Sequence, residues 1–311
     1  MSDKIYDMVI VGGGPAGLTA GIYASRALME VVLLEKGAYG GQMLTTAHLE
    51  NYPGFPEGIG GFELADLMHK QAEAFKLPVE YRSVDTLKKK DDIFVLTSGE
   101  DEIRTRTVLI ATGAVPNKLG APGEEKLTGR GVSYCATCDG ALYKDRAVAV
   151  IGGGDSAVEE ALFLTRFASN VHIIHRRDQL RAVPLTSERA LSNERIKMEW
   201  NTVLKEILGE DEVRELVLED VKSGKTRLLE VDGVFIYVGI TPITDFVADL
   251  VELDDGGYIM TDKTMVSSVP GIFAAGDVRS DSIRQVSSAV GDGATAAFNA
   301  YKYLEEKWGR E

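Results

Sequence analysis

Cysteine is nearly absent from this sequence: there are two in 311 residues, Cys135 and Cys138. So few cysteines cannot build the disulfide framework of a small secreted protein, which favours a reducing compartment and a cytoplasmic location. Long apolar runs are also absent, and none approaches the roughly 18–20 residues that span a bilayer. The first apolar run ends after Val11 at three glycines, which is not the pattern of a signal peptide.

Positive charge and histidine are scarce as well. Lysine and arginine number 34 against 48 aspartates and glutamates, so the net charge is −14. This balance argues against nucleic acids and anionic membranes as partners. A structural zinc site needs four cysteine or histidine ligands, and only four histidines accompany the two cysteines. Because His172 and His175 belong to a predicted strand and its end, we expect no metal site.

Glycine is abundant, and its placement reveals an internal repeat. Residues 6–36 and 146–177 both read as a buried strand, a glycine turn, an amphipathic helix and a second strand. The two copies superpose with a constant offset of 140 residues, so that Gly12 matches Gly152 and Gly14 matches Gly154. In such a unit the glycines allow a tight turn, backbone approach to a pyrophosphate, and close packing of helix on strand. Two copies in register predict two dinucleotide-binding βαβ units.

The end of the second strand distinguishes the two predicted sites. In the first copy it is Glu35, which suits ribose hydroxyls and repels a 2′-phosphate, as required for FAD or NAD. In the second copy it is His175, followed by Arg176, Arg177 and Arg181. Guanidinium groups bind phosphate oxygens well. A solvated basic turn is the simpler alternative, but in so acidic a protein the cluster favours NADPH.

Two linkers frame the second copy. Residues 110–116 (IATGAVP) and 237–242 (YVGITP) both run from strand through glycine to proline. The predicted architecture is an α/β protein with two Rossmann-like, three-layer domains. Residues 1–116 and 244–311 form a discontinuous first domain, and residues 117–243 form a second domain inserted into it. After this insert, residues 271–278 read as a strand that ends at Gly276 and Asp277, followed by a C-terminal helix.

The chain resembles the low-molecular-weight bacterial-type thioredoxin reductases over essentially its whole length. The resemblance rests on GGGPAGLTA, EKGAYGGQ, ENYPGFP, CATCDG, GGGDSAVEEA, HRRDQLR and GIFAAGDVRSDSIRQVSSAVGDGATAA. It implies an FAD-containing, NADPH-dependent homodimer that reduces the disulfide of thioredoxin. One segment departs from the pattern: Pro184 stands where relatives run into a helix. Proline is tolerated at a first helical position, so we expect this helix to begin late.

The resemblance also implies site residues. For FAD they are Gly12, Gly14, Ala16, Glu35, Lys36, Gly40, Gly41, Gln42, Asn51, Asp277, Arg284, Gln285 and Val286. For NADPH they are Gly152, Gly154, Asp155, Ser156, Glu159, His175, Arg176, Arg177 and Arg181.

The two cysteines form a CxxC motif followed by Asp139. An inert buried pair would leave Asp139 and both cofactor folds unexplained, so we interpret the motif as a redox dithiol. The resemblance implies that Cys138 faces the flavin and that Cys135 attacks the partner disulfide. Thiol–disulfide exchange needs an acid for the departing sulfur, and Asp139 is the candidate.

A disulfide close to the flavin is shielded from a partner protein, and the nicotinamide needs the same flavin. We therefore expect the inserted domain to rotate on the two linkers between half-reactions. The alternatives are the same scaffold reducing another thioredoxin-like protein, or a reductase supplied by ferredoxin. The arginine cluster argues against the second of these.

Overall fold

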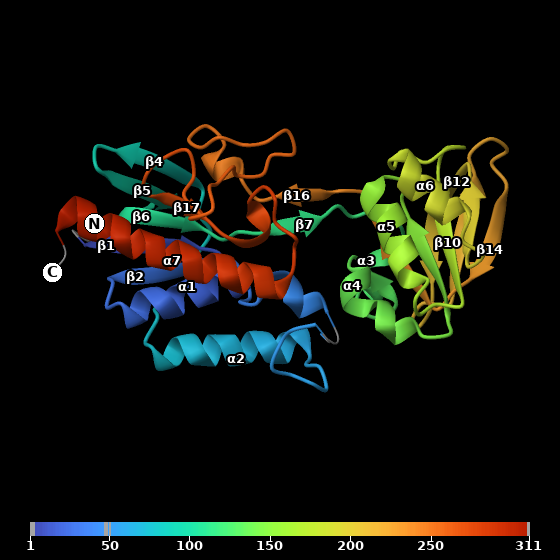
Figure 1. Cartoon of the computed structure of the whole chain (residues 1–311), viewed down its shortest axis with the longest axis horizontal. Coiled ribbons are helices and arrows are strands. Elements are labelled where there is room, and N and C mark those ends of the chain that lie inside the picture. The colour runs from blue at the N-terminus through green and yellow to red at the C-terminus, as the bar shows by residue number, and fades with distance from the viewer. Residues whose placement is uncertain (1–3, 47–48, 50, 310–311) are drawn as a thin grey trace. The chain divides into compact units, whose positions relative to one another are not determined.

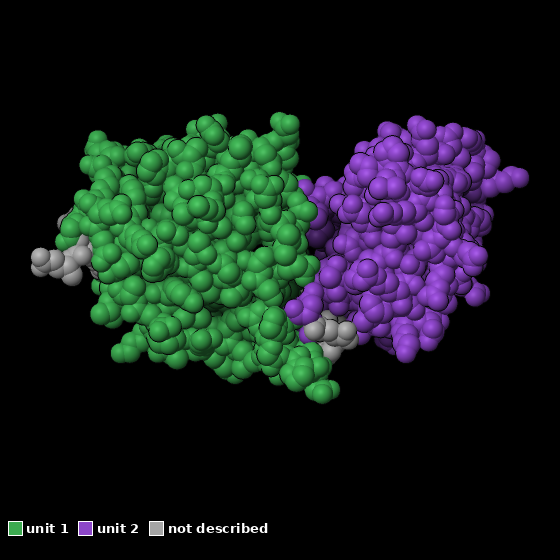
Figure 2. Space-filling model, viewed as in Figure 1, with its two compact units in different colours: residues 1–44, 52–115, 241–311 green, residues 45–51, 116–240 purple. Residues whose placement is uncertain are grey.

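The chain forms two compact units, and the computed structural model describes residues 4–46, 49 and 51–309 (Figure 1). The first unit comprises residues 1–44, 52–115 and 241–311, and the second comprises residues 45–51 and 116–240 (Figure 2). The larger part of the second unit is thus inserted in the sequence of the first. Each unit has its own sheets and core, as expected for a domain.

A seven-stranded sheet lies at the centre of the first unit. Its strands follow the order β3-β2-β1-β6-β5-β4, and β17 also pairs with β6. The pairs β1–β2, β1–β6, β2–β3 and β6–β17 are parallel, whereas β4–β5 and β5–β6 are antiparallel. The bounds are β1 (Ile5–Val11), β2 (Val31–Glu35), β3 (Val79–Tyr81), β4 (Thr86–Lys90), β5 (Ile93–Ser98), β6 (Asp101–Ile110) and β17 (Ile272–Ala274).

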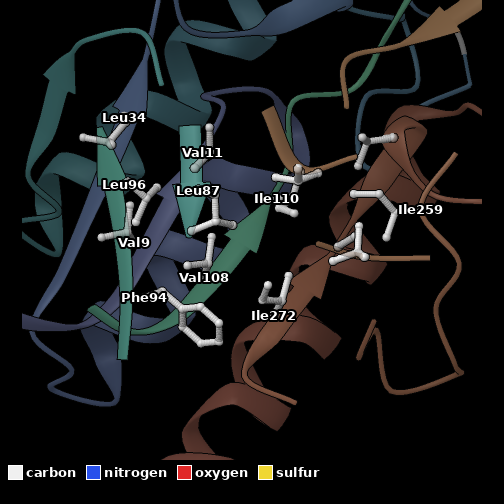
Figure 3. Close-up of a cluster of buried hydrophobic side chains, with 14 of the residues drawn as sticks. Val9, Val11, Leu34, Leu87, Phe94, Leu96, Val108, Ile110, Ile259 and Ile272 are labelled. Atoms are coloured by element: carbon white, nitrogen blue, oxygen red, sulfur yellow. The ribbon is translucent and has the colours of Figure 1, made fainter. Parts of the chain in front are cut away.

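The central strand β1 is continuously apolar where it is buried on both faces. Residues 8–11 (MVIV) are all buried, as expected for a parallel strand covered on each side. Figure 3 shows the core on one side of this sheet, where Val9 and Val11 join Phe94, Ile110 and Ile272. This core holds the carboxyl ends of β1 and β6 rigidly, which is where the glycine turn begins.

Helices α1 and α7 run along the same sheet and pack closely on each other (Figure 1). A Cβ atom at Gly293 of α7 would lie 2.2 Å from the carbonyl oxygen of Ala16 in α1. The two helix backbones therefore touch, and only glycine fits at this crossing. The helical segments of the first unit are α1 (Pro15–Arg26), η1 (Gly41–Thr45), α2 (Gly61–Ala74), η3 (Asp245–Val247), η4 (Gly276–Val278) and α7 (Val286–Trp308).

The second unit repeats the strand–turn–helix–strand arrangement. Its parallel sheet follows the order β11-β10-β9-β15-β8, and a three-stranded antiparallel sheet follows the order β12-β13-β14. The strands are β8 (Val132–Ser133), β9 (Ala147–Ile151), β10 (Asn170–His175), β11 (Ile196–Trp200), β12 (Thr202–Leu208), β13 (Glu215–Asp220), β14 (Thr226–Glu230) and β15 (Gly233–Ile236). The helical segments are α3 (Glu124–Leu127), α4 (Ala136–Asp139), η2 (Gly140–Tyr143), α5 (Asp155–Leu164) and α6 (Pro184–Leu191).

The predicted repeat is confirmed, since β1–α1–β2 and β9–α5–β10 occupy corresponding stretches of sequence. One expected boundary is wrong: the strand near residue 272 ends at Ala274 and does not reach Asp277. The chain turns at Gly276, whose φ of +77° and N–H bond to Asp292 are incompatible with a continuing strand. Asp277 therefore lies in the 3-10 turn η4.

The two connections between the units pair with each other. Strands β7 (Ala114–Pro116) and β16 (Ile240–Pro242) form a two-stranded sheet. The Asn117 N–H donates to the Gly239 carbonyl at 2.9 Å, and the Ile243 N–H donates to the Gly113 carbonyl at 3.1 Å. The connections thus form one ribbon. Among the described residues, none of the helices has the length and apolar character needed to cross a bilayer.

Candidate active site

The first glycine turn joins β1 to α1. Gly12 has a φ of +108°, and a Cβ there would lie 2.4 Å from the Ala111 carbonyl oxygen. A Cβ at Gly17 would lie 1.9 Å from the Gly12 carbonyl oxygen, so the helix packs directly on the turn. A Cβ at Gly14, by contrast, would meet nothing within 4 Å. The helix start thus faces open space, which is what a bound pyrophosphate requires.

The carboxylate of Glu35 is held at the end of β2 by backbone donors. The Gly13 N–H donates to Oε2 at 2.7 Å, and the Gly37 N–H donates to Oε1 at 2.8 Å. An ionised carboxylate accepts about four hydrogen bonds, so acceptor positions remain for ribose hydroxyls. Lys36 is exposed beside it. This arrangement fits the adenosine ribose of FAD.

The next glycine pair lies against the first turn. The Gly40 N–H donates to the Gly13 carbonyl at 2.8 Å, and a Cβ at Gly41 would lie 3.4 Å from the Gly14 Cα atom. Gln42 follows, exposed, in η1. Asn51 is also exposed, and its segment clusters with the second unit, so the structure does not group it with these glycines.

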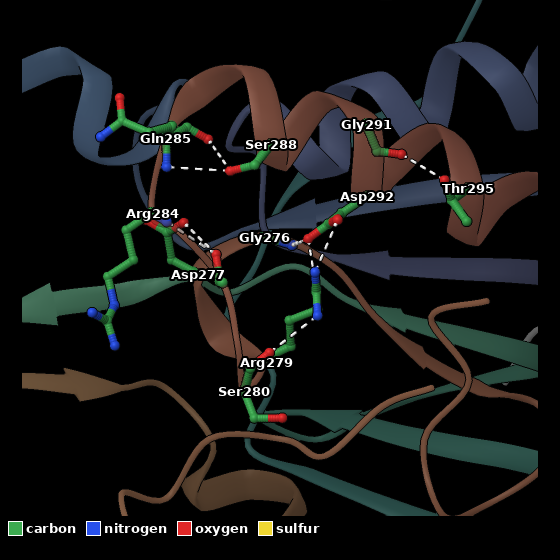
Figure 4. A network of polar contacts seen from close by, with 11 residues as sticks. Gly276, Asp277, Arg279, Ser280, Arg284, Gln285, Ser288, Gly291, Asp292 and Thr295 are labelled. Atoms are coloured by element: carbon green, nitrogen blue, oxygen red, sulfur yellow. Dashed lines mark hydrogen bonds and ion pairs between the residues drawn. The ribbon is translucent and has the colours of Figure 1, made fainter. Parts of the chain in front are cut away.

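The turn around Asp277 lies against the start of α1 at Ala16. Figure 4 shows this turn beside the entry to α7 at Arg284 and Gln285. A Cβ at Gly276 would lie 3.2 Å from the Cβ of Ala16 and 3.5 Å from that of Ala289. The Ser282 hydroxyl donates to Asp277 Oδ1 at 3.4 Å. Burial raises the pKa of Asp277 above its usual 3.8, while this hydrogen bond and the nearby Arg284 guanidinium lower it. A half-buried carboxyl at this position suits a ribityl hydroxyl.

Arg284, Gln285 and Val286 form the entry to α7. Gln285 is the N-cap residue and forms a reciprocal capping box with Ser288, and Val286 is the first helical residue. Arg284 has a left-handed φ of +53°, uncommon outside glycine, and its guanidinium lies 5.2 Å from the Tyr258 ring centroid. N–H groups at the start of a long helix stabilise negative charge.

An ion pair that the sequence motifs did not reveal supports this turn. Asp292 of α7 accepts from Arg279 Nε at 2.6 Å, from Arg279 Nη2 at 3.2 Å and from the Gly276 N–H at 3.1 Å. The side chains are only 10% and 17% exposed, respectively. The one available signal was an acidic residue within the small, apolar run AVGDGATAA.

The second glycine turn joins β9 to α5. Gly152 has a φ of +153°, and its N–H donates to the Ile174 carbonyl at 3.2 Å. A Cβ at Gly153 would lie 2.3 Å from Nδ1 of His175, whereas the nearest atom to a Cβ at Gly154 is Arg181 Nη2 at 3.9 Å. His175 thus covers the turn, and the space before α5 is open toward Arg181. Ser156 and Glu159 are exposed on α5.

The three arginines lie around this turn. Arg176, Arg177 and Arg181 are exposed, and within the described part of the chain none of them pairs with a carboxylate. The Arg181 N–H donates to the Gly153 carbonyl at 2.6 Å, which holds the arginine loop against the turn. Unpaired guanidiniums beside a helix start fit a 2′-phosphate.

Two further features belong to the same loop. Burial lowers the pKa of His175 below 6.5, and the neighbouring charge of Arg181 lowers it further. Nε2 of His175 is buried and has no hydrogen-bond partner among the described residues.

The Val183 N–H donates to Asp155 Oδ1 at 2.7 Å, and Pro184 is the first residue of α6. The helix therefore begins at the proline, and the arginine loop ends just before it.

The two cysteines form a disulfide within one turn. Cys135 is the N-cap residue of α4, its Cα lies 5.3 Å from that of Cys138, and the Cys138 N–H donates to its sulfur at 3.2 Å. Oδ2 of Asp139 accepts from the Ser133 hydroxyl at 2.6 Å. Burial is the larger influence and raises the pKa of Asp139, and this hydrogen bond offsets only part of that increase. The structure thus joins a disulfide to a carboxyl that retains its proton to higher pH than usual.

Two more polar groups lie next to the CxxC turn, and neither was predicted from the sequence. The Tyr237 hydroxyl accepts from the Ala136 N–H at 2.7 Å. Oε2 of Glu160 is buried without a hydrogen-bond partner in the described part of the chain. Burial raises the pKa of Glu160, and the negative charge of Glu159 raises it further. Burial also raises the pKa of Tyr237 well above 10.

Comparison with known proteins agrees with this geometry. Residues 6–293 match the pyridine nucleotide-disulphide oxidoreductase family. The chain is 48% identical over 305 residues to the thioredoxin reductase of Listeria monocytogenes, covering 98% of this chain and 95% of that protein. It is 49% identical over 300 residues to the thioredoxin reductase of Treponema pallidum, covering 96% and 97%.

Solved structures agree as well. The crystal structure of thioredoxin reductase from Streptococcus pyogenes matches with a TM-score of 0.94 at 47% identity, covering 98% of this chain and 100% of that one. Thioredoxin reductase from Giardia duodenalis matches with a TM-score of 0.90 at 35% identity, covering 97% and 99%.

Proposed function

The chain belongs to the pyridine nucleotide-disulphide oxidoreductase family and, within it, to the thioredoxin reductases; from this premise we propose how its residues divide the reaction. The reaction is the NADPH-dependent reduction of the thioredoxin disulfide, with FAD as the resident cofactor. The observation that carries the proposal is the Cys135–Cys138 disulfide, in the same unit as an unpaired arginine cluster.

The first unit holds FAD. When bound, FAD accepts a hydride from NADPH and passes two electrons to a disulfide. Gly12, Gly14 and Ala16 leave room for its pyrophosphate, and Glu35 accepts from its adenosine ribose. Asp277 accepts from a ribityl hydroxyl, and the N–H groups of Arg284, Gln285 and Val286 stabilise negative charge on the ring. The FAD-binding set of the first unit is completed by Lys36, Gly40, Gly41 and Gln42. Asn51 is also proposed to contact FAD, although its segment clusters with the second unit.

The second unit holds NADPH. The pyrophosphate and nicotinamide side of the site is formed by Gly152, Gly154 and the α5 residues Asp155, Ser156 and Glu159. Arg176, Arg177 and Arg181 bind the 2′-phosphate, and His175 closes the turn as a neutral ring. The support is local: the guanidiniums have no carboxylate partners in the described residues, and the histidine pKa is lowered.

The two cysteines have different tasks. By the family resemblance, Cys138 would be the sulfur that faces the flavin, and Cys135 would be the sulfur that attacks thioredoxin. The Cys138 N–H is 3.2 Å from the Cys135 sulfur, so it stabilises a thiolate there once the disulfide opens. Asp139 donates a proton to the departing sulfur of thioredoxin, because burial raises the pKa of this carboxyl.

The two half-reactions need different neighbours for the same flavin. The paired connections β7 and β16 act as one hinge ribbon, with Gly113 and Gly239 both at positive φ. Rotation about this ribbon alternately presents NADPH and the dithiol to FAD. A cross-link between the units should stop turnover and leave FAD bound, and unimpaired turnover in the cross-linked enzyme would rule out the rotation.

The enzyme works as a cytoplasmic homodimer. Tyr23 of α1 and Phe298 of α7 are 46% and 53% exposed, and these helices pack against each other. Exposed aromatic side chains on neighbouring helices suit a contact with a second copy. The two cysteines occupy the redox motif, which suits a reducing compartment. The physiological partner is a thioredoxin, and neither nucleic acid nor membrane is involved.

The first experiment is an anaerobic titration of the flavin absorbance with NADPH and with NADH, followed by oxidised thioredoxin. We expect bleaching at a far lower concentration of NADPH and recovery when thioredoxin is added. Bleaching without recovery would redirect the search to another disulfide partner. No bleaching by NADPH, with dithionite still effective, would point to ferredoxin.

The phosphate site has a matched test. Arg177→Ala should raise KM for NADPH about tenfold to a hundredfold, since a charge-assisted hydrogen bond contributes about 1.5–3 kcal/mol. KM for NADH should stay within about twofold because NADH lacks the phosphate. Arg214→Ala is the control, because Arg214 is exposed in the same unit and pairs with Glu212. Equal losses for both nucleotides would contradict the assignment.

A further inference from the structure

The Ser133 hydroxyl lies between the CxxC backbone and the carboxyl group of Asp139. Its Oγ is 2.6 Å from Asp139 Oδ2, and it accepts from the Cys135 N–H at 3.1 Å. Ser133 is only 5% exposed and belongs to β8, where it pairs with Phe235 of β15. The hydroxyl is thus held from both sides, by a strand and by the redox turn.

The direction of these bonds follows from the chemistry of a hydroxyl, which has one proton and two lone pairs. A lone pair of Ser133 Oγ is occupied by the Cys135 N–H. The proton has two acceptors within reach, Asp139 Oδ2 at 2.6 Å and the Cys135 carbonyl at 3.4 Å. Hydrogen bonds between oxygens are normally about 2.5–3.0 Å long. Ser133 therefore donates to Asp139 Oδ2.

This leaves one position for the acid proton of Asp139. Oδ2 already accepts from Ser133, so a protonated Asp139 carries its proton on Oδ1. Oδ1 is buried and has no hydrogen-bond partner among the described residues. A proton on Oδ1 is therefore not committed to a described neighbour, and it can be transferred to a sulfur that comes within hydrogen-bond distance when the partner binds.

The other ionisable groups around Asp139 do not favour its charged form. Tyr143 of η2 and Tyr237 after β15 sense the negative charge of Asp139, and burial raises the pKa of both phenols. Glu160 of α5 acts on Tyr237, and burial raises its pKa as well. The Ser133 hydrogen bond is the influence that lowers the pKa of Asp139.

We propose that Ser133 is a positioning residue for the exchange reaction with thioredoxin: it orients the Asp139 carboxyl so that the transferable proton lies on Oδ1, and it couples that carboxyl to the backbone of Cys135. This inference rests on the proposed role of Asp139 as the acid.

The proton balance of the step is complete. The Cys135 thiolate first attacks the thioredoxin disulfide, which forms the mixed disulfide and releases one thioredoxin sulfur as a thiolate. The proton on Asp139 Oδ1 moves to that sulfur, and the resulting carboxylate accepts the proton of the Cys138 thiol. The Cys138 thiolate then bonds to the Cys135 sulfur and breaks the mixed disulfide, and the second thioredoxin sulfur leaves as a thiolate and takes the proton back from Asp139. Asp139 regains its proton from the solvent, the enzyme dithiol is oxidised to the disulfide, and the thioredoxin disulfide is reduced to two thiols.

The test is the pH profile of the exchange step in the holoenzyme. Enzyme reduced with NADPH is mixed anaerobically with oxidised thioredoxin, and new thioredoxin thiols are trapped by rapid quench. Ser133→Ala removes the hydrogen bond to Asp139, so the neutral carboxyl should persist to higher pH. The alkaline limb of the rate should move up by about one to two pH units. Flavin reduction by NADPH should change less than about twofold.

Matched variants separate the hydroxyl from the packing around it. Ser133→Thr and Ser133→Val have nearly the same shape, and both suit a strand, but only threonine retains the hydroxyl. The threonine variant should keep the alkaline limb of the pH–rate profile at its native position, and the valine variant should shift that limb to higher pH. Ser267→Ala is the general control, because Ser267 is a buried serine of the first unit whose hydroxyl, among the described residues, bonds to Val269 alone. An unmoved limb in both the alanine and valine variants would overturn the proposal.

An Asp139→Asn background identifies the titrating group. In this background Ser133→Ala should cause no further shift, because the acid is gone. A shift that persists there would show that Ser133 acts on another group. If Asp139→Asn alone leaves the exchange rate unchanged, the proposed acid is wrong, and that result is distinct from a failure of Ser133.

Discussion

Replacing Asp292 with alanine should destabilise the first unit more than any surface ion-pair deletion. Asp292 accepts two bonds from Arg279 and one from the Gly276 N–H, and both side chains are largely buried. Removing one partner of a buried pair costs about 3–5 kcal/mol, since the other charge stays uncompensated. Alanine is the better helix former by up to about 0.7 kcal/mol. We expect a net loss of about 3 kcal/mol.

The assay is urea unfolding of the FAD-loaded enzyme, followed by circular dichroism and flavin fluorescence at a fixed excess of FAD. Excess cofactor is needed because ligand loss would itself lower the apparent stability. Asp101→Ala is the control: Asp101 pairs with Arg82 in the same unit but is 69% exposed. Such an exposed pair contributes at most about 1 kcal/mol.

The difference in stability between the Asp292→Ala and Asp101→Ala variants shows whether the buried ion pair stabilises the turn. If Asp292→Ala costs no more than Asp101→Ala, the buried pair does not hold the turn. A second observable is FAD affinity, which should fall in the Asp292 variant because Gly276 loses its N–H acceptor beside Asp277. Replacing Arg279 with leucine as well should recover much of the stability, since apolar substitutes for a buried pair are often neutral.

Two further outcomes follow from the same reasoning. Gly17→Ala should cost about 3 kcal/mol of folding free energy, since its Cβ would lie 1.9 Å from the Gly12 carbonyl oxygen. Gly14→Ala should fold normally and weaken only FAD binding, because a Cβ there meets nothing within 4 Å. Calorimetry and flavin retention separate the two variants, and equal stabilities would contradict the packing. Because the pKa of His175 is lowered in the folded state, the unfolded chain takes up the extra proton as pH falls below about 6.5. Unfolding of the second unit should therefore become easier from about pH 6.5 toward 5, and the same pH slope in His175→Gln would assign the effect elsewhere.

The cofactor folds could be predicted because their determinants are local in sequence. The repeated glycines, the apolar strands and the residue that ends each second strand all lie within about thirty residues, and the βαβ unit is built from such short-range patterns. The arginine loop and the CxxC were equally visible. These features predicted both units and the inserted order.

The contacts that tune the site could not be predicted, because they join distant segments. Tyr237 and Ala136 are 101 residues apart, and their contact depends on the parallel register of β8 with β15, in which Ser133 pairs with Phe235. Asp292 meets Gly276 only after α7 has packed beside α1. Ser133 lies two residues before the CxxC motif, but a serine in sequence does not show which oxygen it donates to.

The middle glycine of each turn can now be explained by the residue that covers it. The dinucleotide fingerprint leaves this position open, yet it is glycine in both copies, Gly13 and Gly153. A Cβ at Gly13 would lie 3.2 Å from Glu35 Oε2, and one at Gly153 would lie 2.3 Å from His175 Nδ1. The side chain that ends the second strand folds over the turn in each unit. This excludes a side chain at Gly153, where the clash would be severe, and disfavours one at Gly13, where Glu35 would have to shift slightly. The two copies then differ in what the covering group does. Glu35 accepts the Gly13 N–H, and in the proposed FAD site it would also accept from the ribose. Burial and the neighbouring arginines lower the pKa of His175, so in the proposed NADPH site the arginine charges would remain for the 2′-phosphate.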